Sequence, residues 1–251
     1  MFESARLKIK RANHHIGDLK GTFTRMIEDS HGSFIIRDNP ETGNLVEVRF
    51  GETILTDLAL MAGDAVHNLR TALDHATWEL IGIDGGTQDK STAFQTSAND
   101  RDYEAACNGI KTPRSDTKKF FISLAAFPGG AGEKFYHLHH LDISDKHKVV
   151  TPVIGIATVD HLKLMNPDGQ VMVEVKNCSF RMGPDGSAGL VGGFGPLASV
   201  RVDQDAKATL RVLFGEVEFF QGLPLIKTLM ELSDAVEVCM GQFEEFVVSR
   251  E

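Results

Sequence analysis

The sequence is poor in the residues that mark several large classes of protein. It has 251 residues but only one tryptophan, two tyrosines and three cysteines, Cys107, Cys178 and Cys239. Three scattered cysteines make neither a disulfide framework nor a zinc-finger spacing, and they are typical of a reducing compartment. We therefore expect a cytoplasmic protein that does not depend on disulfides.

Long apolar runs and an excess of positive charge are also missing. No window approaches the roughly 18 consecutive apolar residues of a membrane-spanning helix, and the first fifteen residues, MFESARLKIKRANHH, lack the apolar stretch of a secretion signal. We expect no membrane association. The formal net charge of −9 argues against broad, non-specific binding to nucleic acid.

Positive charge is nevertheless concentrated in places. Residues 1–25 carry six basic side chains against two acidic ones, whereas residues 216–251 carry eight acids against two bases. A basic loop over 111–119 contains Lys111, Arg114, Lys118 and Lys119. These segments are either solvated surfaces or a local site for a phosphate-bearing substrate.

Apolar residues recur at helical spacing in three long segments. They are residues 4–28, about 53–81 and 222–249. Short β-type runs surround a turn signal in 33–50, and alternating runs fill 149–220.

These patterns predict a single α+β domain over 1–251. A small helical bundle, with the long central helix and the N- and C-terminal helices, would join an antiparallel sheet formed by the 33–50 hairpin and residues 149–220. The motif-bearing helical part would be about 1–148, the sheet-rich part 149–220, and the closing helix about 222–249.

The long central helix has two chemically different faces. At about 100° per residue, one arc is apolar, and the opposite arc carries Asp64, His67, Asn68, Thr71, Asp74, His75 and Trp78, with Arg70 at its border. A plain surface face typically carries Lys and Glu four residues apart. Side chains that donate, accept or titrate indicate instead a functional site or a buried polar network between helices; both alternatives stay open.

A second cluster of titratable residues lies in 137–147. The segment reads HLHHLDISDKH and holds four of the ten histidines. Histidine with carboxylate can bind a transition metal, move protons near neutral pH, or cap the end of a helix. The cluster is a candidate for any of these three roles.

Three segments resemble a family of uncharacterised bacterial and phage-associated proteins. They are LKIKRANHHIGDL at 7–19, GDAVHNLRTALDH at 63–75 and LHHLDISDKH at 138–147. That family shares a G-D-A-x-H-N-L-R-x-A-L-D-H helix and a later D-K-H element, and it implies no assigned activity.

The segment from Arg70 to His75 is also similar to the motif of HEPN-type helical domains. In those domains an arginine and a histidine four to six residues apart form a metal-independent ribonuclease site, commonly across a dimer. The resemblance implies that His75 acts as general acid or base and that Arg70 stabilises the phosphate, with Asn68, Asp74 or His147 in support. It implies no cofactor, RNA as the partner and a homodimer; the basic loop and Trp78 would bind the substrate.

Two other functions fit the same residues. The first is a metal-binding protein or metal-dependent hydrolase, with ligands drawn from His67, Asp74, His75, His140, Asp145 and His147. The second is a non-enzymatic interaction module. Its polar face would be a satisfied network in which Asp64, His67, Asn68 and Asp74 pair with His15, His140 or Lys146.

Overall fold

The structure is a computed structural model of the chain. It describes residues 1–30, 33–39, 43–49, 52–147, 150, 152–165, 168–178, 201–202 and 207–250. Six helices lie within these ranges: α1 (Glu3–Ser30), α2 (Glu52–Ile83), α3 (Asp100–Asn108), α4 (Ser115–Leu124), α5 (Glu133–His147) and α6 (Leu225–Val248). The strands in them are β1 (Ser33–Asn39), β2 (Gly43–Arg49), β3 (Pro152–Met165), β4 (Val171–Cys178), β5 (Arg201–Val202) and β6 (Lys207–Phe214).

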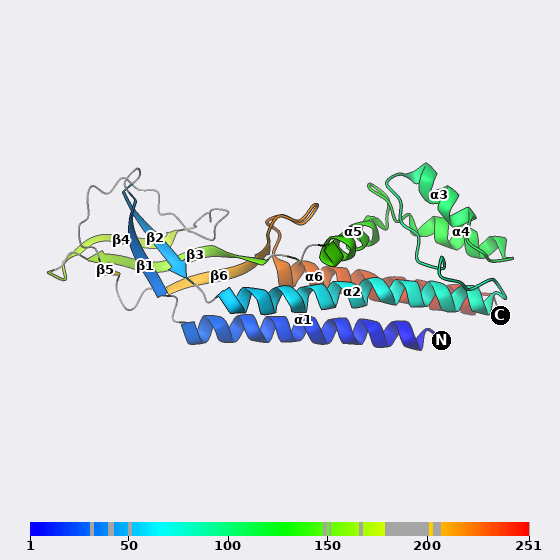
Figure 1. The fold of residues 1–251 in the computed structure, drawn as a ribbon, viewed down its shortest axis with the longest axis horizontal. Coiled ribbons are helices and arrows are strands. Elements are labelled where there is room, and N and C mark those ends of the chain that lie inside the picture. Colours follow the sequence, from blue (N-terminus) through cyan, green and yellow to red (C-terminus); the bar gives the residue numbers. More distant parts are fainter. Residues whose placement is uncertain are drawn as a thin grey trace.

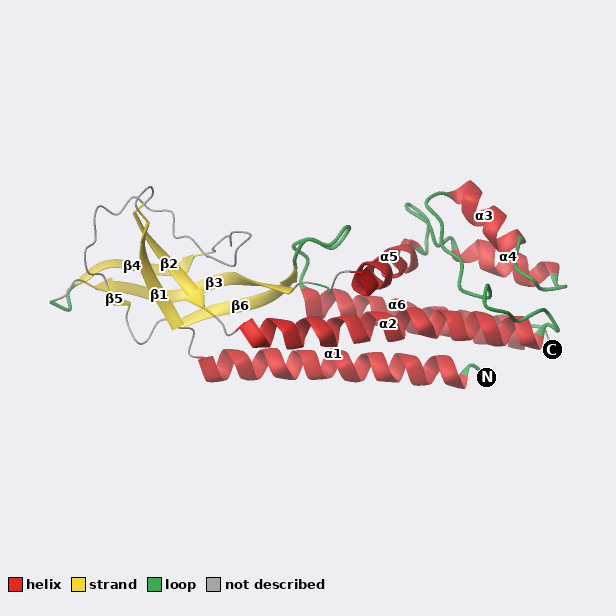
Figure 2. Ribbon diagram, viewed as in Figure 1, coloured by secondary structure: helices red, strands yellow, loops and turns green. Residues whose placement is uncertain are grey.

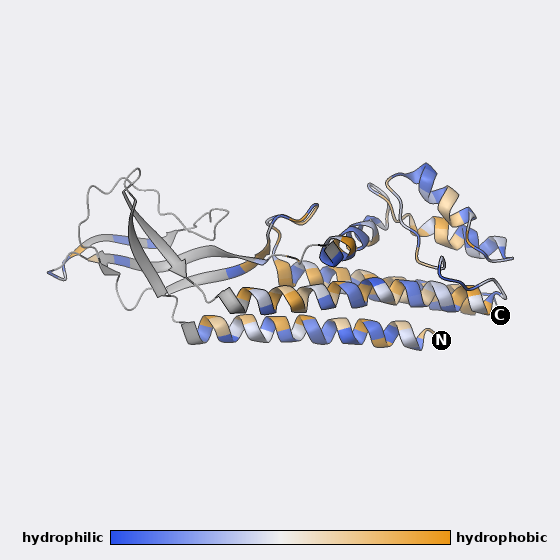
Figure 3. Cartoon of the chain, viewed as in Figure 1, coloured by the Kyte–Doolittle hydropathy of each residue, from blue (hydrophilic) through white to orange (hydrophobic). Residues whose placement is uncertain are grey.

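The three long helices α1, α2 and α6 lie side by side and form the body of the protein (Figure 1). The chain enters α1 and leaves α6 at the same end of the bundle. Each helix mixes hydrophilic and hydrophobic residues along its length (Figure 3), as amphipathic helices do. Leu19, Leu73 and Phe243, one from each helix, are fully buried. The water-excluded core is therefore built by the helices.

The shorter helices cover one side of α2 and α6. Helix α5 packs on α2, and α3 and α4 pack on each other near the C-terminal end of the bundle. The hydroxyl of Tyr103 in α3 donates to the carbonyl oxygen of Phe121 in α4, at 2.7 Å. Both side chains are buried, so this contact fixes the pair of helices.

The carboxylate of Asp84, just after α2, ties three distant segments together. Its side chain is 0% exposed. It accepts hydrogen bonds from the hydroxyls of Thr112 (2.8 Å) and Thr117 (2.6 Å) and from Nη1 of Arg250 (2.9 Å). A buried carboxylate needs such partners, so the loop before α4 and the first turn of α4 are held against the ends of α2 and α6.

The strands extend from the end of the bundle opposite the two chain termini (Figure 2). β1 and β2 form an antiparallel two-stranded hairpin of their own. β3 is central in the other group, where it pairs antiparallel with β4, β5 and β6.

The predicted α+β class, with an antiparallel sheet as a main layer, is wrong: the protein is mainly helical. Among the strands that the structure describes, β1 and β2 form one sheet and β3 to β6 form another, so the predicted single sheet is divided. Among the strand side chains that the structure describes, Val212 and Phe214 belong to the hydrophobic core, and the rest of that core comes from helices and loops. Alternation in the sequence indicates extended backbone, but it does not show that a sheet face becomes a core layer. Of the helices described, not one combines the length and the apolar character that a membrane crossing needs.

Candidate functional site

Arg70, predicted to stabilise a phosphate, is buried and held by three acceptors. Its side chain is 7% exposed. Nη1 donates to Oδ1 of Asp74 at 2.5 Å, Nη2 donates to the carbonyl oxygen of Phe94 at 2.9 Å, and Nε donates to Nδ1 of His139 at 3.2 Å. The guanidinium carbon also lies 6.0 Å from the centre of the Phe94 ring. Each guanidinium nitrogen therefore already has a partner in the protein.

Asp74 extends the same network into the loop after α2. Its Oδ1 accepts both from Arg70 and from the backbone N–H of Phe94, the latter at 2.9 Å. Phe94 is buried and makes a T-shaped, edge-to-face contact with Phe135 of α5, with 5.6 Å between ring centres. Arg70 and Asp74 thus fasten this loop to α2 and α5.

His139 completes the network from α5. Burial lowers the pKa of His139, and the neighbouring Arg70 guanidinium lowers it further. A neutral imidazole can accept at Nδ1 from Arg70, whereas an imidazolium would offer a second donor there. The arrangement therefore requires His139 to be neutral.

The earlier turns of the polar face pair α2 with α5. Nδ1 of His67 lies 3.0 Å from Oδ1 of Asp142, and Nζ of Lys146 donates to Oδ2 of the same carboxylate at 2.6 Å. Asp142 is buried, and both partners are half-exposed. Asp142 is a member of this site that sequence reasoning missed, although it stands four residues before Lys146, the spacing of a helical ion pair.

The side of α2 that faces α1 carries a weaker set of polar contacts. Nζ of Lys8 donates to Oδ1 of Asn68 at 3.4 Å, and Nδ2 of Asn68 donates to the carbonyl oxygen of Asp64 at 2.8 Å. Nδ1 of His15 lies 3.9 Å from Oδ2 of Asp64. Asn68, predicted to support catalysis, thus connects two helices.

Gly63, the first residue of the GDAVHN motif, makes room for Asp145. A Cβ at Gly63 would lie 2.6 Å from both carboxylate oxygens of Asp145. Oδ1 of Asp145 accepts from the backbone N–H of Val150 at 3.3 Å. Burial raises the pKa of Asp145, and the carboxylates of Asp142 and Asp64 raise it further. Here the glycine serves close packing between α2 and α5.

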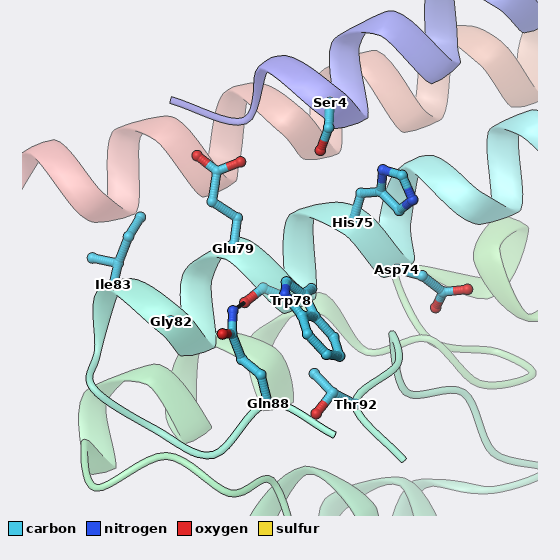
Figure 4. A pocket seen from close by; sticks show the side chains of 9 residues that line it. All are labelled: Ser4, Asp74, His75, Trp78, Glu79, Gly82, Ile83, Gln88 and Thr92. Carbon is cyan, nitrogen blue, oxygen red and sulfur yellow. Dashed lines mark hydrogen bonds between the residues drawn. The ribbon is translucent and has the colours of Figure 1, made fainter. Parts of the chain in front are cut away.

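His75 and Trp78 line a pocket at the C-terminal end of α2, which we name the His75 pocket (Figure 4). It is open to solvent and has a volume of about 780 Å³. Its lining residues are Ser4, Asp74, His75, Trp78, Glu79, Gly82, Ile83, Gln88 and Thr92. Trp78 is 43% exposed, as its place on the polar arc predicts.

One ring nitrogen of His75 is an exception to the satisfied polar face. Nδ1 of His75 is buried and, among the described residues, has no hydrogen-bond partner. In Figure 4, His75 and Glu79 point toward α1, and Trp78 lies next to Thr92. Arg70 is absent from the pocket lining, so the two members of the predicted Arg–His pair have different surroundings.

The second histidine cluster is divided between two surroundings. His139 faces Arg70, whereas His137 stacks on Phe219, in the turn between β6 and α6, with 4.5 Å between ring centres. The ring centres of His140 and Tyr136 lie 4.4 Å apart. His147 ends α5, and its side chain lies outside the described residues.

The predicted metal ligands are likewise dispersed. His75 belongs to the His75 pocket, His67 to the contact with Asp142, and His140 to an aromatic cluster. Within the side chains that the structure describes, no group of three His, Cys, Asp or Glu residues is placed to hold a metal ion.

Of the predicted basic loop, residues 111–119, the part from Ser115 onward belongs to helix α4. Its cations largely serve the protein itself. Three of them donate at 2.6–2.7 Å to protein groups: Lys111 to Asp89, Lys118 to the carbonyl oxygen of Asn108, and Arg114 to Asp116. Lys119 is exposed on α4. None of these four residues lines the His75 pocket.

Comparisons of the chain with models of protein families, with curated proteins and with solved structures found no match. The assignment of function therefore depends on the residues of this chain.

Proposed function

We propose that the protein is a non-enzymatic interaction module. In this proposal the polar face of α2 joins the helices, and the His75 pocket receives a ligand or a partner. The observation that carries it is the engagement of Arg70: its three guanidinium nitrogens donate to Asp74, Phe94 and His139, and its side chain is nearly closed to solvent.

The energetics of burial support a structural role for this arginine. A phosphate could reach the guanidinium only after existing contacts break, which would leave Asp74 and the Phe94 carbonyl without their donor. Losing one partner of a buried, hydrogen-bonded charge costs about 3–5 kcal/mol. Catalytic cations that stabilise a transition state are instead held ready, facing the substrate.

The proposal is tested by assaying the purified protein on a panel of single-stranded and structured RNAs in the presence of EDTA. We expect no cleavage above that of a mock preparation from cells without the protein. We also expect Arg70→Ala to lower the free energy of unfolding strongly. Cleavage that depends on both Arg70 and His75, with both variants as stable as the wild type, would overturn the proposal.

Metal-independent RNA cleavage is the second candidate, and the place of His75 in an open pocket beside Trp78 favours it. A histidine in an open pocket can act as general acid or base, and the exposed Trp78 could stack on a base. This function keeps the resemblance to HEPN-type domains, with RNA as partner and a homodimer as the active form. Its test is EDTA-resistant cleavage that disappears in a folded His75→Ala variant.

A further inference from the structure

We propose that the His75 pocket binds an organic cation, that is, an ammonium or guanidinium group carried on a small organic body. This inference rests on the proposed function, because it names the ligand of the same pocket. It is argued from three properties of the lining: its charge, its aromatic surface and its size.

The charge of the lining favours a cation over a phosphate. Two carboxylates, Asp74 and Glu79, line the pocket, and among its lining residues there is neither a lysine nor an arginine. Arg70 is already bound to Asp74 and does not line the pocket. An anionic ligand would meet like charges here, and a cation would meet opposite ones.

Both carboxylates keep an oxygen for a ligand. The hydrogen bonds from Arg70 and from the Phe94 backbone end on Oδ1 of Asp74, whose side chain is 34% exposed. The backbone N–H of Phe2 donates to Oε1 of Glu79 at 2.6 Å. Within the part of the chain that the structure describes, Oδ2 and Oε2 have no donor and can accept from an N–H of a ligand. Bonds of this charge-assisted kind are the strong ones.

The aromatic surface comes from Trp78. Its indole is 43% exposed and lies between the backbone of α2 and Thr92 (Figure 4). The side chain of Gln88 donates to the carbonyl oxygen of Trp78 at 2.7 Å and so holds the loop beside it. Tryptophan offers the best aromatic face for an ammonium or guanidinium group.

The remaining property is the volume. The volume of about 780 Å³ is that of a small-molecule site and exceeds the needs of a bare ammonium ion. Ile83 and Trp78 add apolar lining for the body of the ligand.

The experiment uses Trp78 as its own probe, because it is the one tryptophan of the chain. Tryptophan emission of the full-length protein is followed during titration with agmatine and with a short peptide, blocked at both ends, whose single charged residue is an arginine. The controls are the same peptide with citrulline in place of arginine, inorganic phosphate and adenosine monophosphate. We expect a saturable change with at least one of the cations, weakened by salt, and none with the controls.

Comparing the two cationic ligands shows whether the natural ligand is a free small molecule or a side chain of a partner protein. Tighter binding of agmatine identifies a free small molecule, and tighter binding of the peptide identifies the side chain of a partner; either result supports the proposal. Glu79→Gln should weaken binding by about tenfold, because a charge-assisted hydrogen bond becomes a neutral one. Glu28→Gln, an exposed position at the other end of α1, is the matched control and should not change binding.

If Glu79→Gln does not fold, Trp78→Leu provides the same test. Because this variant has no tryptophan emission, its binding of the two cations is measured by titration calorimetry, and we again expect weaker binding than in the wild type. Saturation by phosphate or adenosine monophosphate, or no response to either cation at millimolar concentrations, would overturn the inference. These failures are separable from failure of the proposed function, which is decided by the cleavage assay and not by the titration.

Discussion

Nε of Arg70 and Nδ1 of His139 lie 3.2 Å apart and join the middle of α2 to α5. The arginine can only donate, so the histidine accepts and must be neutral. The surroundings of His139 include Asp74, His140 and Asp142, and burial with the Arg70 charge outweighs the two carboxylates, so the pKa is lowered. This contact makes the bundle sensitive to pH.

The stability of the protein should fall in mild acid. The unfolded chain has a His139 pKa near 6.5, and the folded value is lower. The unfolded state therefore binds a proton first, and the contribution of His139 is complete above about pH 6.5 and is lost as pH falls toward the folded pKa. Urea unfolding at about pH 7.5 and about pH 5.5 should show a smaller difference in His139→Asn than in the wild type. Equal differences would show that this contact does not control the response.

A methyl group at Gly63 should destabilise the protein. Gly63→Ala would place Cβ within 2.6 Å of the Asp145 carboxylate, and we expect the free energy of unfolding to fall by about 1–3 kcal/mol. Gly17→Ala on α1 is the matched control: apart from the adjoining residues and the backbone of its own helix, no atom lies within 4 Å of the added Cβ, so better helix propensity should raise stability by about 0.5–1 kcal/mol. Both are measured by denaturant unfolding, and two stabilising substitutions would contradict the packing described for Gly63.

Removal of the Asp84 carboxylate should loosen residues 111–119, which comprise a loop and the first turn of α4. Asp84→Ala leaves Arg250 and two threonines without their buried acceptor, so a loss of about 3 kcal/mol is expected. Asp116→Asn is the control: it removes an exposed charge, which contributes little, and keeps an oxygen that can accept from the backbone N–H of Thr117. Hydrogen exchange should show faster exchange at Thr112 to Thr117 in Asp84→Ala alone. Unchanged exchange there would mean that other contacts hold the loop.

The course of the long helices and the polar arc of α2 could be predicted from the sequence. Helical spacing over about 53–81 corresponds to α2, Glu52–Ile83, and the arc from Asp64 to Trp78 does carry the polar contacts. Periodicity reports the direction in which a side chain leaves its own helix, and that direction is decided locally.

The partners of those side chains could not be predicted, because they come from distant segments. Phe94 and His139, which bind Arg70 in the structure, each lie more than twenty residues away from it in the sequence. One local signal was present: Asp74 stands four residues after Arg70, the spacing of an ion pair on a helix. The mainly helical class was missed for a similar reason, since alternation in 149–220 says nothing about which elements build the core.

The most direct test of the account compares the free energies of unfolding of Arg70→Ala and His75→Ala. We predict a loss of about 3 kcal/mol or more for Arg70→Ala, because it leaves partners of a buried charge unsatisfied. His75→Ala, which removes a group that has an unpartnered buried nitrogen and lines an open pocket, should change stability by less than about 1 kcal/mol. An Arg70→Ala protein as stable as the wild type, or a His75→Ala protein as unstable as we predict for Arg70→Ala, would contradict the account.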